Sequence, residues 1–348
     1  MQNSRIQTID LIKVIAMICV MGLHCAGVFV SLNEGNISGN IVGRISVCAI
    51  PLFFMVSGYL LLGRNHLDLS YSITKIIHII KFVAVCTFSY TLIFWIWRFL
   101  NGYQFDYLDI MKNFIGAFIK RGAFSIFWYF GAMIIIYLIY PYINRLFINN
   151  FKSFVAILLA LCFFEFIVYT QQICHTSLKT KILQGVLESS IPQTFRLWNW
   201  LFYFMLGGVL KKEEVINFIK SYFSVWTVII LGAINICLQM LLLPALKKIQ
   251  CEYFYSAFFV IAYTSAIFIN ICSRRITNNK FISEMSKLFL PVYAFHMFVI
   301  QALSKMEVIW NIFGCLAPFV FWIIVSVLTI TISYFFIKIP LAKKLFTI

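Results

Sequence analysis

Charge is scarce in this sequence, and most of it has one sign. Only 11% of the 348 residues are charged, against about 25% in a typical soluble domain. The 12 acidic residues are far outnumbered by 28 basic ones, whereas apolar residues make up 62% of the chain. Such a composition excludes a disordered or collagen-like chain and an ordinary water-soluble domain. It predicts a protein that lies in a membrane.

Cysteine motifs and proline-rich linkers are also missing. The ten cysteines are scattered, without a CxxC pair or a cluster with histidine, which argues against a zinc site and against a disulfide framework. The 7 prolines form no linker, and no low-complexity stretch marks a domain boundary. We therefore predict one membrane domain over residues 1–348, with no metal and no bound cofactor.

Long apolar runs recur along the whole chain. A helix needs about 20 mostly apolar residues to cross the ~30 Å hydrocarbon layer, and the 18% content of aromatic residues suits lipid-facing and interfacial positions. The expected fold class is an all-α polytopic membrane protein with about ten transmembrane helices. We predict them at 8–30, 42–62, 76–100, 124–143, 153–172, 197–210, 223–244, 254–272, 287–304 and 313–337.

The basic residues predict the orientation of the chain in the membrane. More of the 28 fall in the inner segments than in the outer ones when both termini are cytoplasmic, as the positive-inside rule requires. The net charge of +16 is then mostly explained by cytoplasmic loops that face anionic lipid. Since no nucleic-acid motif accompanies it, we expect the lipid bilayer, and no nucleic acid, as a partner.

The first predicted helix carries three ionisable residues, Asp10, Lys13 and His24. Ionisable groups inside a bilayer are costly and are functional candidates by default. Lys13 and His24 are eleven positions apart, which is three turns plus about 20°, so they share one face and are separated by roughly 16 Å along the axis. Asp10 falls within about 40° of this face. The alternative is that Lys13 extends to the inner headgroups and His24 is a packing residue.

Four segments resemble the membrane-bound acyltransferase 3 family. Lys13, ten residues and His24 are similar to its first-helix signature, which usually begins with Arg. PLFFMVSGYL at 51–60 closely resembles its PLFFxxSGYL segment, the most specific of these motifs. The sequences at 127–130 and 136–141 are similar to its fourth-helix pattern, and Tyr293–His296 to its late Tyr-x-x-His. The matches follow the family order over nearly the whole chain.

The resemblance implies an enzyme that transfers an acyl group, usually acetyl from acetyl-CoA as cosubstrate, to a hydroxyl of a cell-surface carbohydrate. The enzymes that O-acetylate O-antigens and the enterobacterial common antigen are similar, which implies polysaccharide modification at the bacterial inner membrane. A neutral imidazole suits the deprotonation of a hydroxyl near pH 7, so His24 is the expected general base or, alternatively, an acyl carrier. Lys13 keeps the charge of the family's Arg but loses its bidentate fork.

Further polar residues are candidates for the donor and acceptor sites. Lys75, His78 and Lys81 stand at spacing three near the inner end of the third helix, and they either bind the phosphates of CoA or form a positive-inside flank. Other residues are expected to contact the acceptor or to support the site: Asp10, Arg44, Ser57, Glu165 and His296.

Each of these has a structural alternative. Ser57 precedes Gly58, so close helix packing is favoured over a nucleophilic role. Arg44, just before the second helix, is an interfacial anchor or an acceptor contact. Glu165 pairs with a cation or orients His24, and a structural hydrogen bond is favoured for His296 over direct catalysis.

The rival function is a transporter or flippase of a lipid-linked sugar, which would also have many helices and a few buried charges. We find no interrupted helices in corresponding halves, the pattern typical of inverted-repeat carriers. Asn235 and Gln239, one helical turn apart, are expected to form interhelical hydrogen bonds rather than a substrate site.

Overall fold

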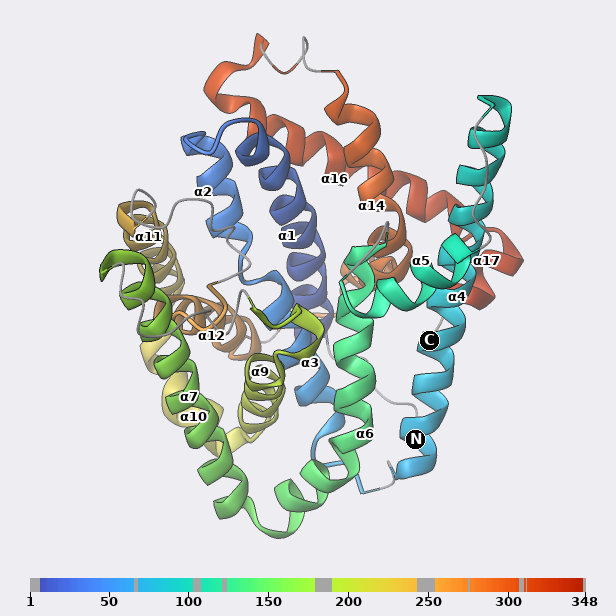
Figure 1. Ribbon diagram of the computed structural model, residues 1–348. Coiled ribbons are helices and arrows are strands. Elements are labelled where there is room, and N and C mark those ends of the chain that lie inside the picture. The colour runs from blue at the N-terminus through green and yellow to red at the C-terminus, as the bar shows by residue number, and fades with distance from the viewer. Residues whose placement is uncertain are drawn as a thin grey trace. The chain divides into compact units, whose positions relative to one another are not determined.

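In the computed structural model, the described part of the chain is built from helices, with no strand (Figure 1). The structure describes residues 7–65, 68–102, 108–120, 124–178, 190–242, 254–274, 276–306, 310 and 312–346. The chain divides into two compact units, each assembled from separate segments. The first unit comprises residues 1–60, 163–184 and 203–347, and the second comprises 61–162, 185–202 and 348. The single membrane domain stays a prediction.

The first unit is organised around its N-terminal helix. α1 (Gln7–Leu32) packs against five other helices of this unit, of which α2, α14 and α16 lie alongside it in Figure 1. The helices that lie wholly in this unit are α1, α2 (Ile37–Ser46), α10 (Glu213–Ile219), α11 (Val225–Leu242), α12 (Phe258–Cys272), α13 (Lys280–Lys287), α14 (Phe289–Ser304), α16 (Ala317–Phe336) and α17 (Pro340–Phe346).

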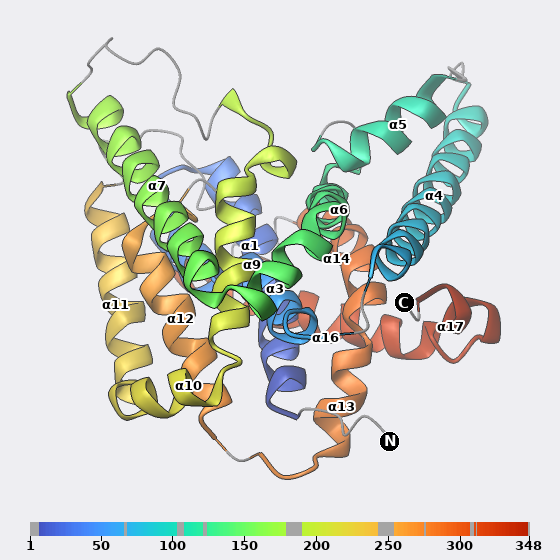
Figure 2. The same ribbon diagram turned by 90° about the horizontal axis from the view of Figure 1, so that it is seen from below.

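The second unit contains the long helix α4 (Leu69–Leu100), which packs against α5 (Leu108–Phe118) and α6 (Trp128–Asn149) (Figure 2). Phe82 of α4 meets Phe130 of α6 edge to face, with ring centroids 5.3 Å apart, in the geometry that aromatic pairs prefer. Three helices contribute residues to both units: α3 (Ala49–Leu61), α7 (Phe151–Leu178) and α9 (Leu197–Val209).

Many of the helices are long and apolar enough to cross a membrane, so the predicted all-α polytopic membrane protein is confirmed. Six helical stretches of the described residues pass this test, and up to 8 do so if each of two bent pairs is one span. The bent pairs are α10 with α11, at 75°, and α13 with α14, at 63°. α9 and α12 are apolar but shorter. All ten predicted segments overlap helices of the described residues, whereas the count of ten spans stays a prediction.

The second predicted span differs from the structure in its start and its continuity. Its helix begins at Ile37 instead of 42, because Asn36 caps it by accepting a hydrogen bond from the backbone N–H of Gly39 at 2.8 Å. The helix is then interrupted at Val47 and Cys48, between α2 and α3. Pro51 explains the break, since it has no N–H for the carbonyl of Val47 and its ring clashes with a helical carbonyl four residues back.

The third predicted span also begins earlier than expected. α4 starts at Leu69 instead of 76, and the Asp68 carboxylate accepts a hydrogen bond from the backbone N–H of Tyr71 at 3.1 Å. The polar first two turns are therefore part of the same helix as the apolar run. Lys75 consequently lies inside α4 and not before it.

Candidate functional site

The helix that carries Asp10, Lys13 and His24 is held closely by its neighbours in the first unit. At Gly22, an added Cβ would lie 2.2 Å from Ser46 Oγ of α2 and 2.8 Å from the Trp322 ring of α16. Trp322 also donates its indole N–H to the carbonyl of Ile18 at 2.9 Å. Glycine allows this approach because it has no side chain. His24 therefore projects from a segment of α1 with a fixed position.

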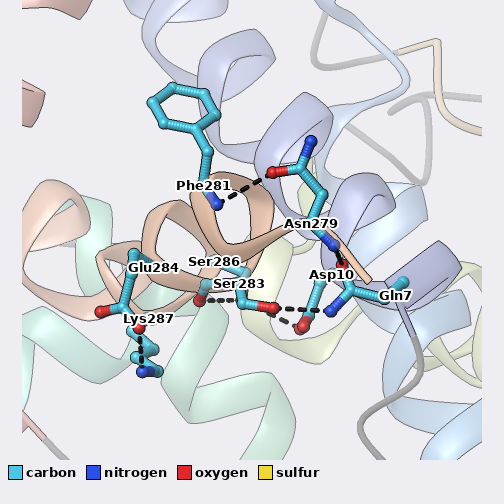
Figure 3. Close-up of polar contacts among 8 residues, drawn as sticks. All are labelled: Gln7, Asp10, Asn279, Phe281, Ser283, Glu284, Ser286 and Lys287. Carbon is cyan, nitrogen blue, oxygen red and sulfur yellow. Dashed lines mark hydrogen bonds and ion pairs between the residues drawn. The ribbon is translucent and has the colours of Figure 1, made fainter. Parts of the chain in front are cut away.

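The beginning of α1 is joined to α13 by a network of polar side chains (Figure 3). Ser286 donates its hydroxyl to Asp10 Oδ1 at 2.9 Å, and Gln7 donates its amide to Ser283 Oγ at 2.7 Å. The backbone N–H of Asn279 donates to Gln7 Oε1 at 3.3 Å. Asp10 is only 3% exposed. Asp10 thus anchors α13, and its predicted role at the acceptor stays a prediction.

His24 lies beside a second histidine. Its ring centroid is 5.0 Å from that of His296 on α14, and the two planes are tilted by 45°. His24 is half-buried, whereas His296 is 0% exposed. The two candidate histidines, separated by more than 270 residues in the sequence, therefore lie side by side (the His24–His296 pair).

The His296 ring is oriented by its own helix. Its Nδ1 lies 3.1 Å from the carbonyl oxygen of Val292. Because a carbonyl can only accept a hydrogen bond, Nδ1 is the donor and carries the proton. Tyr293 adds an aromatic contact, with its ring centroid 5.7 Å from that of His296. The predicted structural hydrogen bond of His296 is therefore present, and it leaves the Nε2 atom available.

The predicted donor residues are divided between the two units. Lys13 is half-buried on α1 of the first unit, whereas Lys75, His78 and Lys81 lie on α4 of the second. Lys75 is half-buried, with its Nζ atom 5.6 Å from the centroid of the Tyr71 ring, while His78 and Lys81 are exposed. That these four residues bind one donor stays a prediction.

The second unit has a cavity at the beginning of α4. It measures about 580 Å³. Its lining is rich in amide groups and includes a basic side chain; the lining residues are Asn65, Asp68, Leu69, Pro141, Tyr142, Asn144, Arg145, Ile148 and Asn149. Asn144 holds the loop that precedes α4, because it accepts from the N–H of Gly63 at 2.8 Å and donates to the carbonyl of Arg64 at 2.9 Å. The cavity thus combines amide, carboxylate and guanidinium groups with apolar side chains.

Arg44 is not an interfacial anchor, and this alternative was wrong. It lies in the last turn of α2 and is only 1% exposed. Its Nη1 atom donates to the carbonyl oxygen of Asn40 at 3.0 Å and to Asn40 Oδ1 at 2.7 Å. A guanidinium removed from water needs such acceptors. A contact of Arg44 with the acceptor stays a prediction.

Asn235 forms the expected interhelical hydrogen bond, whereas the amide of Gln239 bonds within its own helix. Asn235 of α11 donates its amide to the carbonyl oxygen of Arg44 on α2 at 3.1 Å, and Gln239 donates to Asn235 Oδ1 at 2.6 Å. Both side chains are buried. The Asn235 amide thus joins α11 to a backbone carbonyl near the end of α2, and Gln239 holds this amide in place.

Gly58 takes part in close helix packing, as the sequence favoured. Ser57 donates its hydroxyl to the carbonyl of Phe53 at 2.9 Å within α3. An added Cβ at Gly58 would lie 1.7 Å from the carbonyl oxygen of Phe204 on α9, and one at Gly207 would lie 2.0 Å from that of Met55. The two backbones therefore cross in contact, with a glycine on each side.

Glu165 is 0% exposed, although its neighbours Phe164 and Phe166 on α7 are exposed. A carboxylate at this buried position, between two exposed phenylalanines, faces the protein and not the lipid. Neither of its two predicted roles is tested. Among the described residues, no group of three or more His, Cys, Asp or Glu side chains is placed to hold a metal ion.

Sequence reasoning missed the partners of several candidate residues. Ser283 and Ser286 of α13, which bond to Gln7 and Asp10, lie in a short polar helix that the spans excluded. The only available signal was spacing. Gln7 and Asp10 are three positions apart, as are Ser283 and Ser286, so the two residues of each helix share a face. Asn40 precedes Arg44 by four residues, a spacing that also brings side chains together.

The comparisons with known proteins identify a family. Residues 6–338 match the model of the family described as an acyltransferase domain, which is the acyltransferase 3 family that the motifs resemble. No curated protein and no solved structure matches the chain.

Proposed function

The chain belongs to the acyltransferase 3 family, and on that premise we propose that it transfers an acetyl group from acetyl-CoA to a hydroxyl of a cell-surface carbohydrate. The single observation that carries this proposal is the His24–His296 pair, with ring centroids 5.0 Å apart. It places an imidazole base in a half-buried position of a membrane helix. The proposed location is the bacterial inner membrane.

The proposed reaction is acyl transfer with His24 as general base. A lone pair of His24 takes the proton of the acceptor hydroxyl while the hydroxyl oxygen attacks the thioester carbonyl. The tetrahedral intermediate collapses, the C–S bond breaks, and the thiolate of CoA takes the proton from the His24 imidazolium. The products are an O-acetylated sugar and free CoA, and His24 returns to its neutral form. If His24 is instead an acyl carrier, its lone pair attacks the thioester carbonyl and the C–S bond breaks with release of the CoA thiolate. The acceptor hydroxyl then attacks the acetyl-imidazole, His24 is released, and the hydroxyl proton replaces the proton that the thiolate takes up.

The donor is proposed to bind on the cytoplasmic side through basic residues. Lys13 precedes His24 by about three turns, and Lys75 lies less than two turns beyond Leu69, which lines the cavity of the second unit. Arg145 adds another cation to this cavity. Both Arg and Lys bind phosphate groups, Arg through its bidentate fork and Lys as a point charge. Within the second unit, the cavity with its Arg145, and Lys75 on the helix that begins at its lining residue Leu69, support a site for the nucleotide part of CoA.

Replacement of Lys13 tests the donor site. We expect Lys13→Ala to raise the KM for acetyl-CoA by roughly 10- to 100-fold, the loss that one hydrogen bond to a charged group entails. Lys13→Arg should keep most of the activity or improve it, because the guanidinium fork suits phosphate. Lys152→Ala, which removes an exposed lysine from the same predicted side, is the control. Equal binding of acetyl-CoA by the wild type and Lys13→Ala would exclude this role.

The position of His24 predicts which side of the membrane receives the acetyl group. His24 stands seventeen positions after Gln7 in a 26-residue helix, about 26 Å from the helix start and past its middle. If the N-terminus is cytoplasmic, His24 is nearer the outer leaflet. Acetyl-CoA is too polar to follow, so only its thioester arm or a transferred acetyl group reaches His24.

Sealed vesicles of known orientation test this sidedness. With labelled acetyl-CoA on the cytoplasmic side and glycan acceptor on the other, the acceptor should become labelled while CoA stays on the side of its supply. Labelling that needs both substrates on the cytoplasmic side would contradict the topology or the placement of His24.

The helix bends give the carrier alternative no support. α2 and α3 together form one candidate span despite the break between them, and the two helix pairs of the described residues that are bent by more than 40°, α10 with α11 and α13 with α14, both lie after residue 200. An inverted-repeat carrier would have its interrupted helices in corresponding positions of two halves. The acyltransferase proposal explains the paired histidines, which transport of a sugar does not require.

A further inference from the structure

The Nε2 atom of His296 is buried without a hydrogen-bond partner in the described part of the chain. The hydrogen bond from Nδ1 to the Val292 carbonyl fixes the tautomer, so Nε2 bears a lone pair and accepts. The side chain is 0% exposed, and an unsatisfied polar atom in such a place costs about 1–3 kcal/mol. A buried acceptor of this kind indicates that a neighbouring group donates a hydrogen bond to it during function.

His24 is the group placed to supply that donor. Its ring centroid lies 5.0 Å from that of His296, so a small side-chain rotation brings one of its nitrogens to Nε2. Hydrogen bonds between catalytic groups are often long in the absence of substrate and shorten when it binds. A neutral imidazole has one N–H and one lone pair. When the N–H is bonded to His296, the lone pair is on the other nitrogen.

The polar network at the start of α1 joins α1 to α13, the helix that precedes the His296 helix α14. Asp10 precedes His24 by fourteen positions and Ser286 precedes His296 by ten, and the Asp10–Ser286 hydrogen bond joins the two helical segments. The Gln7–Ser283 bond reinforces this connection (Figure 3). From this shared end, α1 and α13–α14 lead to the His24–His296 pair. Sites that are built on helices in this way are positioned more accurately than sites on loops.

We propose that His296 is a positioning residue for His24. Its Nε2 accepts the N–H of His24, which turns the lone pair of His24 toward the acceptor hydroxyl. This inference rests on the proposed function. When His24 takes the hydroxyl proton, the second N–H of its imidazolium stays bonded to His296, which stabilises the charge in a site shielded from water. His296 keeps its own proton on Nδ1 throughout, and the transferred proton leaves with the thiol of CoA.

Two amide substitutions separate positioning from packing. The amide of glutamine reaches the place of Nε2, so His296→Gln retains an acceptor for His24. The shorter asparagine reaches only the place of Nδ1, so His296→Asn keeps a donor to Val292 but loses the contact with His24. We expect His296→Gln to keep kcat within about tenfold of the wild type and His296→Asn to lose roughly 100-fold, as misplacement of a catalytic group does. The KM for acetyl-CoA should be unchanged in both. Equal kcat values for these two variants would overturn the inference.

A double-mutant cycle tests whether His296 acts through His24. His296→Phe alone should lower kcat by roughly 100-fold, yet it should have no further effect in a His24→Ala background. Additive losses, or a His296→Phe variant with the kcat of the wild type, would contradict positioning. Size-exclusion chromatography of each variant checks that it is folded. If His296→Phe does not accumulate, the comparison of His296→Gln with His296→Asn tests the positioning role instead. A fully active His24→Ala would instead overturn the proposed function and the inference together.

Discussion

Replacement of His24 by alanine is expected to abolish carbohydrate acylation while the protein still accumulates in the membrane. A positioned general base contributes about 10²- to 10⁴-fold to a rate, and a loss of the acyl carrier would be at least as severe. His24 is half-buried, so its truncation leaves a small cavity and no buried charge without a partner. Mass analysis of the surface glycans, with and without the variant, measures the effect.

A matched control separates catalysis from packing in this experiment. Val28 lies one turn beyond His24 on the same helix and is also half-buried. Val28→Ala also truncates a half-buried side chain to alanine, but it removes no ionisable group, and we expect normal acylation from it. Normal acylation by His24→Ala would exclude His24 as base and as carrier. Loss of activity in both variants would attribute the effect to helix packing.

Substitution of Gly58 is expected to have the largest effect on folding. Its added Cβ would lie 1.7 Å from the carbonyl oxygen of Phe204, where neither helix has a flexible side chain that can move aside. α3 and α9 would have to separate along their whole contact. Overpacking costs about 1–3 kcal/mol even when side chains can adjust, so Gly58→Ala should cost at least the upper value. Gly207→Ala should do the same, because its Cβ would lie 2.0 Å from Met55 O.

Gly27 provides the control for this prediction. It is exposed on α1, and an added Cβ would have nothing within 4 Å. Alanine in a helix interior is favoured over glycine by roughly 0.5–1 kcal/mol, so Gly27→Ala should be neutral or slightly stabilising. Thermal unfolding in detergent, followed by size-exclusion chromatography, compares the variants. Equal stability of Gly58→Ala and Gly27→Ala would refute the close contact of α3 with α9.

The helices could be predicted from hydropathy because spanning segments must satisfy their backbone internally. Local polar signals were harder to interpret. The stretch from Asn36 to Arg44 contains three glycines or asparagines besides the cap, which reads as a loop, whereas capping by Asn36 and burial of Arg44 make it helix α2. Because α13 is polar, the predicted span began only at its last residue. Hydropathy also gave no sign that α13 and α14 form a bent pair.

The candidate site was predictable where it depends on one helix and not where it depends on several. The shared face of Lys13 and His24 follows from helical periodicity alone. The contact of His24 with His296 depends on how α1 packs against α14, which no local pattern records. In the same way, the spacing of Asn235 and Gln239 predicted an interhelical role, but the choice of the Arg44 carbonyl as the acceptor of the Asn235 amide depends on how α11 packs against α2, which no local pattern records.

Release of CoA by the purified protein tests the central claim most directly. The protein is reconstituted in lipid vesicles with acetyl-CoA and a glycan acceptor, and the free thiol is measured together with acetyl on the acceptor. An acyltransferase that uses His24 should release one CoA for each acetyl group transferred, and His24→Ala should release roughly 10²- to 10⁴-fold less. Movement of the glycan across the membrane without release of CoA, or equal release by the wild type and His24→Ala, would contradict the account.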